Sequence, residues 1–302
     1  MCMINCQAGP SIVSTSLTGL SRLHETRVLI NARAGEEQMA YIMADHRITD
    51  VVVDPDSADA DAVDTLDALY DITRIIRQLR NIPHVNGVRL RSMKLAATPA
   101  AYTRAVINSL GDLNRLSVVN PLRLEIETWF IRAQDVDETH AKLVRRLNNK
   151  GITVYANVPL LGGVNDTDTC IHDLAHALRK VGIEFHHLYV AGLPIQKKWN
   201  MDFPIDSYDV IDIATMVRRE GSGREIPRYI ILTPLGEVDY GLTSRFVREG
   251  DSLKIKLSCY DESYYKTMDE NFIFPQGVEL GKDGNPVVTV PGLVKTNDFP
   301  VS

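Results

Sequence analysis

The chain has 302 residues, of which 44% are hydrophobic and 24% are charged, and its formal net charge at pH 7 is −6. These values are typical of a globular chain. The acidic balance argues against a general nucleic-acid binder, which would present a basic face. No run of about 18 apolar residues occurs, and no basic segment followed by an apolar one opens the chain, so we expect neither a membrane span nor a secretory signal. Four cysteines are too few for a disulfide framework, which favours a reducing cytoplasm.

The first part of the chain, residues 1–33, is predicted to be an irregular N-terminal segment that is rich in Ser, Thr and Gly. Within it, only Arg27–Asn31 has the pattern of a short strand. Two cysteines near its start, Cys2 and Cys6, have the spacing CxxxC.

Strand-length and helix-length patterns alternate over residues 34–243. The expected strands are Thr49–Asp54, Gly87–Arg91, Leu122–Thr128, Ile152–Leu160, Glu184–Val190 and Arg228–Thr233. The expected helices are Glu36–Ala44, Asp61–Leu79, Thr98–Leu110, Glu138–Asn149, Asp168–Val181 and Ser207–Arg219. Regular alternation of this kind is typical of βα units. It predicts an α/β fold, a partial (β/α) barrel of about six parallel strands adjacent in chain order.

The pattern changes near residue 242. Phe246–Ser258 reads as a hairpin around Glu249-Gly250-Asp251, and Gly281–Val290 has turn residues followed by a short strand. We therefore expect residues 244–302 to form a small C-terminal β-rich appendage.

Charged residues alternate along two neighbouring expected strands. Arg89 and Arg91 lie on one face of their strand, and Glu125 and Glu127 repeat the spacing on the next. Acids that point into a barrel need partners, and these arginines are the natural ones. A structural ion-pair network is the leading interpretation; a catalytic carboxylate, or arginines that recognise an acidic substrate, stays open. With Asn157, at least three of these five side chains should lie inside the barrel or at its mouth.

Two further segments have a simple expected geometry. His186 and His187 are adjacent on a strand, so one should point inward and the other outward. The stretch Gly162-Gly163-Val164-Asn165-Asp166 should form a turn that precedes the next helix.

Several of these motifs occur together in a known family. Cys2 and Cys6 match two-thirds of the CxxxCxxC loop of radical S-adenosylmethionine (SAM) enzymes, and Leu160–Asp166 (LLGGVND) follows a core strand. With the segments Arg80–Val85 and His187–Tyr189, they make the chain similar to the lysine 2,3-aminomutase family of radical SAM enzymes over about residues 36–242. The resemblance implies a partial α/β barrel, a [4Fe–4S] cluster held through Cys2 and Cys6, SAM, and cofactor contacts from Asn157 and Ser92.

The chain departs from that family at several positions. Gly9 replaces the third cysteine, so one of the three thiolates that a cluster loop supplies is missing. Asp54-Pro55 stands where the family has a Gly-Gly-Asp-Pro turn for the SAM amino group. Pro234–Asp239 contains no lysine, so we expect no Schiff base with pyridoxal phosphate (PLP).

The leading functional hypothesis is a divergent radical SAM aminomutase-like protein that acts on an amino-acid-like substrate, with Arg89, Arg91 and Glu127 as substrate-binding candidates. The alternative is a non-catalytic barrel that has lost its cluster, SAM and PLP sites and binds a small acidic metabolite or a protein partner. A third hypothesis, a cofactor-independent lyase, would use Lys94 as a Schiff-base amine or Glu127 as a base. The expected partner is a small molecule, with no nucleic acid and no membrane; homo-oligomerisation stays open.

Overall fold

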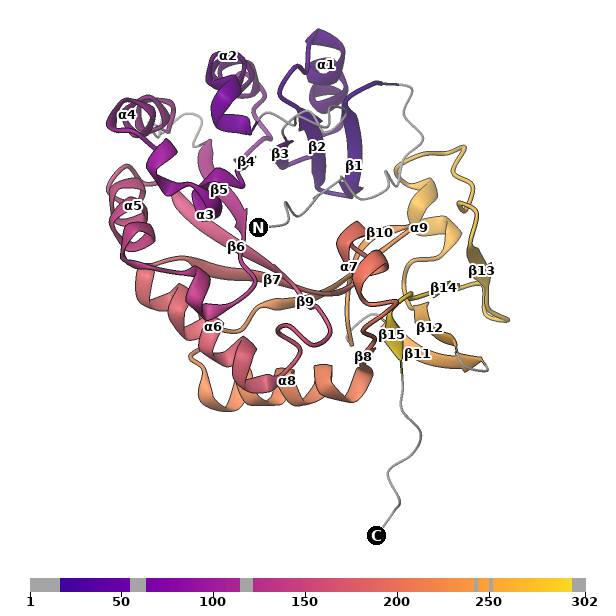
Figure 1. The fold of residues 1–302 in the computed structure, drawn as a ribbon. Coiled ribbons are helices and arrows are strands. Elements are labelled where there is room, and N and C mark those ends of the chain that lie inside the picture. Colours follow the sequence, from indigo (N-terminus) through magenta and orange to yellow (C-terminus); the bar gives the residue numbers. More distant parts are fainter. Residues whose placement is uncertain (1–16, 55–63, 115–121, 242–243, 250–251, 295–302) are drawn as a thin grey trace.

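The computed structural model describes residues 17–54, 64–114, 122–241, 244–249 and 252–294. Its centre is a sheet of nine strands that curves into a nearly closed barrel (Figure 1). In their order across the sheet, the strands are β1 (Leu20–His24), β2 (Arg27–Asn31), β3 (Asp50–Asp54), β4 (Gly87–Arg91), β5 (Arg123–Trp129), β6 (Thr153–Pro159), β7 (Glu184–Ala191), β9 (Arg228–Thr233) and β10 (Gly236–Asp239).

The expected parallel core is confirmed, but the strand count was too low. The six expected strands are β3, β4, β5, β6, β7 and β9, and they pair parallel in chain order. Strand β2 extends this parallel core, and β1 and β10 add antiparallel edges. Both added edges carry few apolar residues, two in β1 (LSRLH) and one in β10 (GEVD), so they lack the apolar pattern by which a core strand is recognised. The described part of the segment expected to be irregular therefore includes two strands of the main sheet.

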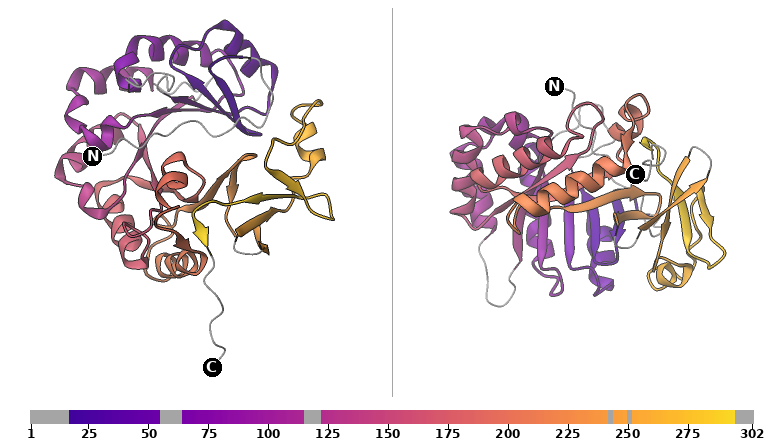
Figure 2. Two further views of the ribbon diagram at one scale, coloured as in Figure 1. Left: turned by 45° about the vertical axis from the view of Figure 1, so that its right-hand side comes forward. Right: turned by 90° about the horizontal axis from the view of Figure 1, so that it is seen from below.

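Helices cover the outer face of this sheet (Figures 1 and 2). The long ones are α1 (Glu36–Ala44), α2 (Leu69–Leu79), α4 (Arg104–Leu113), α5 (Glu138–Asn148), α6 (Asp168–Val181) and α8 (Ser207–Glu220). Short helical segments are η1 (Thr65–Ala68), α3 (Lys94–Ala97), η2 (Pro99–Ala101), η3 (Ala133–Asp135) and α7 (Pro194–Trp199). Helix α4 begins later than expected because the Thr103 side chain accepts a hydrogen bond from the Val106 N–H and caps its first turn.

Strand alternation gives the sheet one apolar and one polar face. Val51, Val53, Val88, Leu90 and Ile126 belong to the large core that also contains the buried faces of the helices. Since successive side chains point to opposite faces, the residues between them face the barrel interior. In the described residues, those interior positions include three buried charged side chains, Asp54, Arg91 and Glu127, which gives the fold a polar centre.

The two ends of the sheet meet at an ion pair between Arg27 of β2 and Glu237 of β10. The C-terminal appendage lies at this side of the barrel (Figure 2). It is a four-stranded antiparallel sheet, with the order β11 (Ser244–Glu249), β12 (Ser252–Leu257), β14 (Pro286–Thr289) and β13 (Val278–Leu280), and a short helix α9 (Glu262–Lys266). The expected hairpin and strand are thus present in the described residues.

Strand β15 (Leu293–Val294) joins the appendage to the barrel by pairing with β8 (Ile205–Asp206). Within the described residues, no helix is both long enough and apolar enough to cross a membrane.

Candidate functional site

A chain of ion pairs crosses the barrel interior between β4 and β5. The Arg89 guanidinium lies 2.9 Å from a Glu125 carboxylate oxygen and 3.4 Å from one of Glu127. The Arg91 Nε donates to the other Glu127 oxygen at 2.8 Å. The expected structural network is therefore confirmed, and all four side chains face the interior.

Glu127 is the centre of this network and is only 2% exposed. Burial opposes ionisation of its carboxyl, but Arg91 and Arg89 outweigh that effect and hold its pKa well below the usual range. Glu127 is thus a permanent carboxylate whose charge is already balanced, which makes it a poor proton acceptor.

Asp54 ends β3 beside the network and is less well compensated. Its carboxylate lies 3.5 Å from an Arg91 nitrogen, the one ion pair it makes within the described part of the chain. Burial raises the pKa of Asp54 to about 6, against the opposing effect of Arg91, and the nearby Glu127 charge raises it further. Asp54 is therefore the interior carboxylate that would gain most from an additional cationic partner.

Next to the ion pairs lies a row of uncharged polar side chains on three adjacent strands. Trp129 of β5, Asn157 of β6 and His187 of β7 are register neighbours, and each is at most 4% exposed. Trp129 Nε1, both amide atoms of Asn157 and both ring nitrogens of His187 have no hydrogen-bond partner among the described residues. Since buried polar groups are normally hydrogen-bonded, these five atoms mark a place where a partner is missing.

The histidine pair differs from the expected alternation. Strand β7 contains a β-bulge. Ala156 of β6 pairs with Phe185, but the next residue, Asn157, pairs with His187, so His186 is an extra residue without a partner position on β6. As a result, both imidazoles face the interior. The His186 Nε2 lies 3.1 Å from an Arg89 guanidinium nitrogen, and the centroids of the two imidazole rings are 3.8 Å apart. Burial lowers the pKa of His186 to about 2 and that of His187 well below 6.5, so both rings are neutral.

A further buried carboxylate, Glu237, lies on the far side of the interior. The Tyr189 hydroxyl donates to it at 2.7 Å, and Arg27 pairs with its other oxygen. Both of its oxygens are therefore satisfied, and the contact ties together β2, β7 and β10.

Ser92 follows β4 and lies at the edge of this site. Its hydroxyl donates to the Asp64 carboxylate at 2.9 Å, and the same carboxylate accepts the Lys94 backbone N–H. This arrangement fixes the connection after β4. The Lys94 side chain itself pairs with Asp67 near the surface, away from the interior.

The LLGGVND stretch forms the expected turn before α6. Asn165 is fully buried, and its side-chain amide donates to the carbonyls of Ile131 and Pro159 while its oxygen accepts from the Leu161 N–H. It therefore connects the loops that follow β5 and β6. Thr167, one residue after this stretch, provides the helix cap.

The cysteine motif cannot be placed, because Cys2 and Cys6 lie outside the described residues. The other two cysteines, Cys170 and Cys259, are exposed. No cluster of three or more His, Cys, Asp or Glu side chains suited to a metal ion occurs in the part of the chain that the structure describes.

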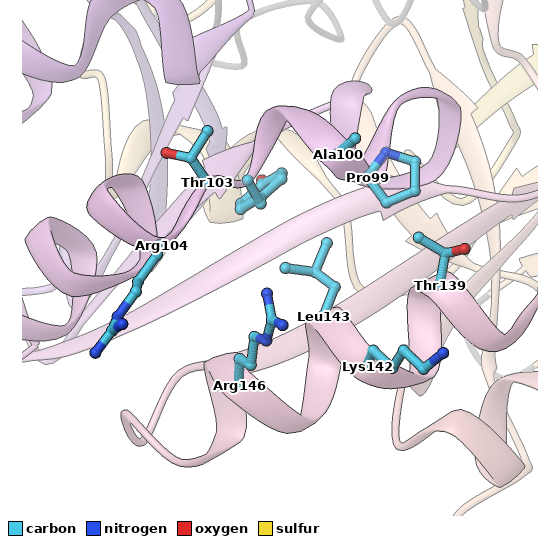
Figure 3. A pocket seen from close by; sticks show the side chains of 9 residues that line it. Pro99, Ala100, Thr103, Arg104, Thr139, Lys142, Leu143 and Arg146 are labelled. Atoms are coloured by element: carbon cyan, nitrogen blue, oxygen red, sulfur yellow. The ribbon is translucent and has the colours of Figure 1, made fainter.

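A hollow of about 260 Å³ lies outside the barrel, between the Pro99–Arg104 segment and α5. Figure 3 shows Arg146 reaching from α5 toward that segment, with Lys142 and Thr139 further along the helix. Its cationic side chains are solvent-exposed, and it lies on the helical outer face of the sheet, so it is separate from the interior site.

Comparisons with known proteins point to the aminomutases. No protein-family model matches the chain. The glutamate 2,3-aminomutase of Clostridioides difficile is 24% identical over 247 residues, which cover 82% of this chain and 53% of that protein. The L-lysine 2,3-aminomutase of Acetoanaerobium sticklandii is 23% identical over 274 residues, which cover 89% of this chain and 62% of that protein. The chain is a divergent relative of the 2,3-aminomutases.

This relationship confirms the resemblance drawn from the sequence, and it gives no support to a non-catalytic barrel. The chain spans 53% to 62% of the length of these two relatives, so their whole activity does not transfer to it directly. A radical SAM methyltransferase from Sphaerobacter thermophilus has a similar fold over 70% of this chain and 68% of its own, at 14% identity and a TM-score of 0.37. That likeness is too weak to add to the fold described above.

Strand alternation predicts that at least three of five side chains lie inside the barrel or at its mouth, and the structure places all five there: Arg89, Arg91, Glu125, Glu127 and Asn157. That prediction missed the part played by Trp129, although Trp129 continues the alternation of Glu125 and Glu127 and could have been found by extending it. Both histidines point inward because of the bulge in β7, and Glu237 lies in the interior because β10 pairs antiparallel with β9. The sequence has no clear signal for either feature.

Proposed function

We propose that the barrel interior binds an amino-acid-like small molecule, as an aminomutase-like member of the radical SAM proteins would require. The observation that carries this proposal is the buried pair Asp54 and Arg91 at the carboxyl ends of β3 and β4. Ligand sites of α/β barrels lie at that end of the strands.

The pair has the chemistry to recognise a zwitterion. The Arg91 guanidinium presents a fork of N–H donors that suits a carboxylate, and Asp54 would accept from an ammonium group. At 3.5 Å the two side chains are loosely joined, so a ligand could replace their mutual contact by two shorter ones. Glu127 would keep Arg91 in position through its 2.8 Å hydrogen bond.

The residues that the resemblance implies for SAM lie in the described part of the chain, whereas those that it implies for an iron–sulfur cluster do not. The supporting relatives are aminomutases. Of the two residues that the resemblance implies for SAM, Ser92 already donates its hydroxyl to Asp64, and Asn157 belongs to the buried row with Trp129 and His187. When bound with a cluster, SAM would supply a radical that abstracts hydrogen from the substrate. The described residues contain no ligand set for an iron–sulfur cluster, so no step is assigned through one.

Calorimetric titration with L-amino acids tests the proposal. We expect binding to the unmodified chain, a loss of about tenfold to a hundredfold in affinity for Arg91→Met, and a similar loss for Asp54→Asn, since each removes a charge-assisted hydrogen bond. Arg77→Met, which changes an exposed arginine on α2, should bind normally. Equal affinity in all four proteins, or no binding by any of them, would refute the proposal.

A further inference from the structure

The row formed by Trp129, Asn157 and His187 has a hydrogen-bonding pattern that limits what can occupy it. Trp129 Nε1 is a donor, the Asn157 amide offers an NH₂ group and an oxygen, and a neutral imidazole offers one donor and one acceptor. All five atoms are buried and without partners in the described part of the chain. A group that satisfies them must therefore both donate and accept.

The row carries no formal charge of its own. Burial is the main cause that disfavours the charged form of His187 and lowers its pKa. Arg27, Arg228 and Arg89 act in the same direction, and Glu127 opposes them. Their own partners already neutralise the nearest of these groups: Arg27 pairs with Glu237, and Arg89 with Glu125. A charged group placed against Trp129, Asn157 and His187 would lose its hydration without gaining a counter-ion, and this disfavours its binding.

The row is also close to the proposed zwitterion site. Trp129 lies two residues beyond Glu127 on β5, about 7 Å along the strand by its ordinary rise per residue, and Glu127 holds Arg91. The bulge that turns both histidines inward brings His187 into line with Asn157 and Trp129. Bulges of this kind often re-aim side chains beside active sites.

We infer that Trp129, Asn157 and His187 form a specificity pocket for the side chain of the ligand, and that this side chain ends in an uncharged group that donates and accepts hydrogen bonds, such as a carboxamide or a hydroxyl. This inference rests on the proposed function, because it requires the α-amino and carboxylate groups to lie at Asp54 and Arg91. It separates this chain from relatives named for glutamate and lysine, whose side chains are charged.

The test compares L-glutamine, L-glutamate and L-lysine by calorimetry. We expect glutamine to bind at least about tenfold more tightly than either charged amino acid, since one buried uncompensated charge costs more than 1.4 kcal/mol. Asn157→Asp should shift the preference toward lysine, because the new carboxylate would face the ammonium group. His187→Phe should weaken the binding of glutamine and leave the weak binding of glutamate unchanged. The control is His176→Gln, which changes an exposed histidine and should bind as the unmodified chain does.

The outcomes separate the two proposals. If amino acids bind and depend on Arg91, but glutamate or lysine binds as tightly as glutamine and Asn157→Asp changes nothing, the specificity pocket is refuted and the proposed function stands. If no amino acid binds at all, both are refuted. Circular dichroism of each variant shows whether a loss of binding reflects a loss of folding, and the gain of lysine binding in Asn157→Asp cannot arise from a structural defect.

Discussion

At the scale of single residues, the interior combines two kinds of polar group. The ion pairs among Arg89, Arg91, Glu125 and Glu127 satisfy one another, whereas Asn157 and His187 have no partner in the described chain. The first group explains how charges can be buried in the barrel, and the second shows where a ligand would be needed. Both carry consequences that can be measured on the protein without a ligand.

Asp54→Asn should stabilise the protein at neutral pH. The folded-state pKa of Asp54, about 6, lies above its value of 3.8 in an unfolded chain. The protonated form therefore favours folding at low pH, and this contribution is lost as the pH rises through about 6. The asparagine variant does not ionise, so it avoids the cost of burying a charged carboxylate at neutral pH. Its free energy of unfolding relative to the unmodified chain should rise between pH 4 and pH 7, by up to about 3 kcal/mol. Urea titrations at several pH values would show it, and a pH-independent difference would contradict the raised pKa.

Glu127→Gln should destabilise the fold by about 3–5 kcal/mol near pH 7, because it leaves two buried arginines without their shared carboxylate. The pKa of Glu127 is lowered in the folded state, so its contribution is present above the unfolded value of 4.5 and is lost as the pH falls below it. The deficit of the variant should therefore shrink in acid. Glu138→Gln, which removes an exposed i,i+4 pair with Lys142, should cost less than about 1 kcal/mol. Similar losses in both variants would contradict the buried network.

At the scale of elements, the strands and helices of the core follow directly from the sequence. The core strands are marked by apolar residues, either in an unbroken run as in β3 or in alternation with charged residues as in β4 and β5. Helix starts carry capping residues such as Thr103 and Thr167. What could not be predicted depends on long-range pairing. The bulge at His186 is set by the register against β6, and β10 becomes a strand because it folds back on β9. Strand alternation therefore predicts the interior position of Arg89 and Glu127. It cannot predict that of Glu237, because β10 is not recognisable as a strand from the sequence.

The end of β7 depends on one glycine. Gly192 has φ +103°, and a Cβ atom there would lie 1.9 Å from the Leu232 carbonyl oxygen of β9. Gly192→Ala should therefore shift the backbone between β7 and α7 and lower the free energy of unfolding by more than about 2 kcal/mol. Gly223→Ala is the matched control, because nothing lies within 4 Å of its Cβ position. Equal thermal stability of the two variants would show that the close approach to β9 is not needed.

At the scale of the whole molecule, the barrel is nearly closed by short antiparallel edges at both ends of its parallel core, with an ion pair where the ends meet. Closure encloses the polar interior and leaves the helices to cover the apolar face.

The cysteine motif gives a prediction for the chain as a whole. With Gly9 in place of the third cysteine, Cys2 and Cys6 supply two thiolates where a cluster loop supplies three. Anaerobic reconstitution of this chain should therefore give less than one [4Fe–4S] cluster per molecule and no reductive cleavage of SAM. Iron and sulfide analysis, with Cys6→Ala as the comparison, measures this. A full cluster that is lost in Cys6→Ala, together with release of 5′-deoxyadenosine, would overturn the expectation.

The most direct test of the interior as a ligand site is a crystal structure grown with a saturating concentration of L-glutamine. We expect one molecule inside the barrel, with its carboxylate on Arg91, its ammonium group at Asp54, and its carboxamide hydrogen-bonded to Asn157 and His187. Glutamine found only on the outer face, or an interior that contains water alone at saturation, would contradict it.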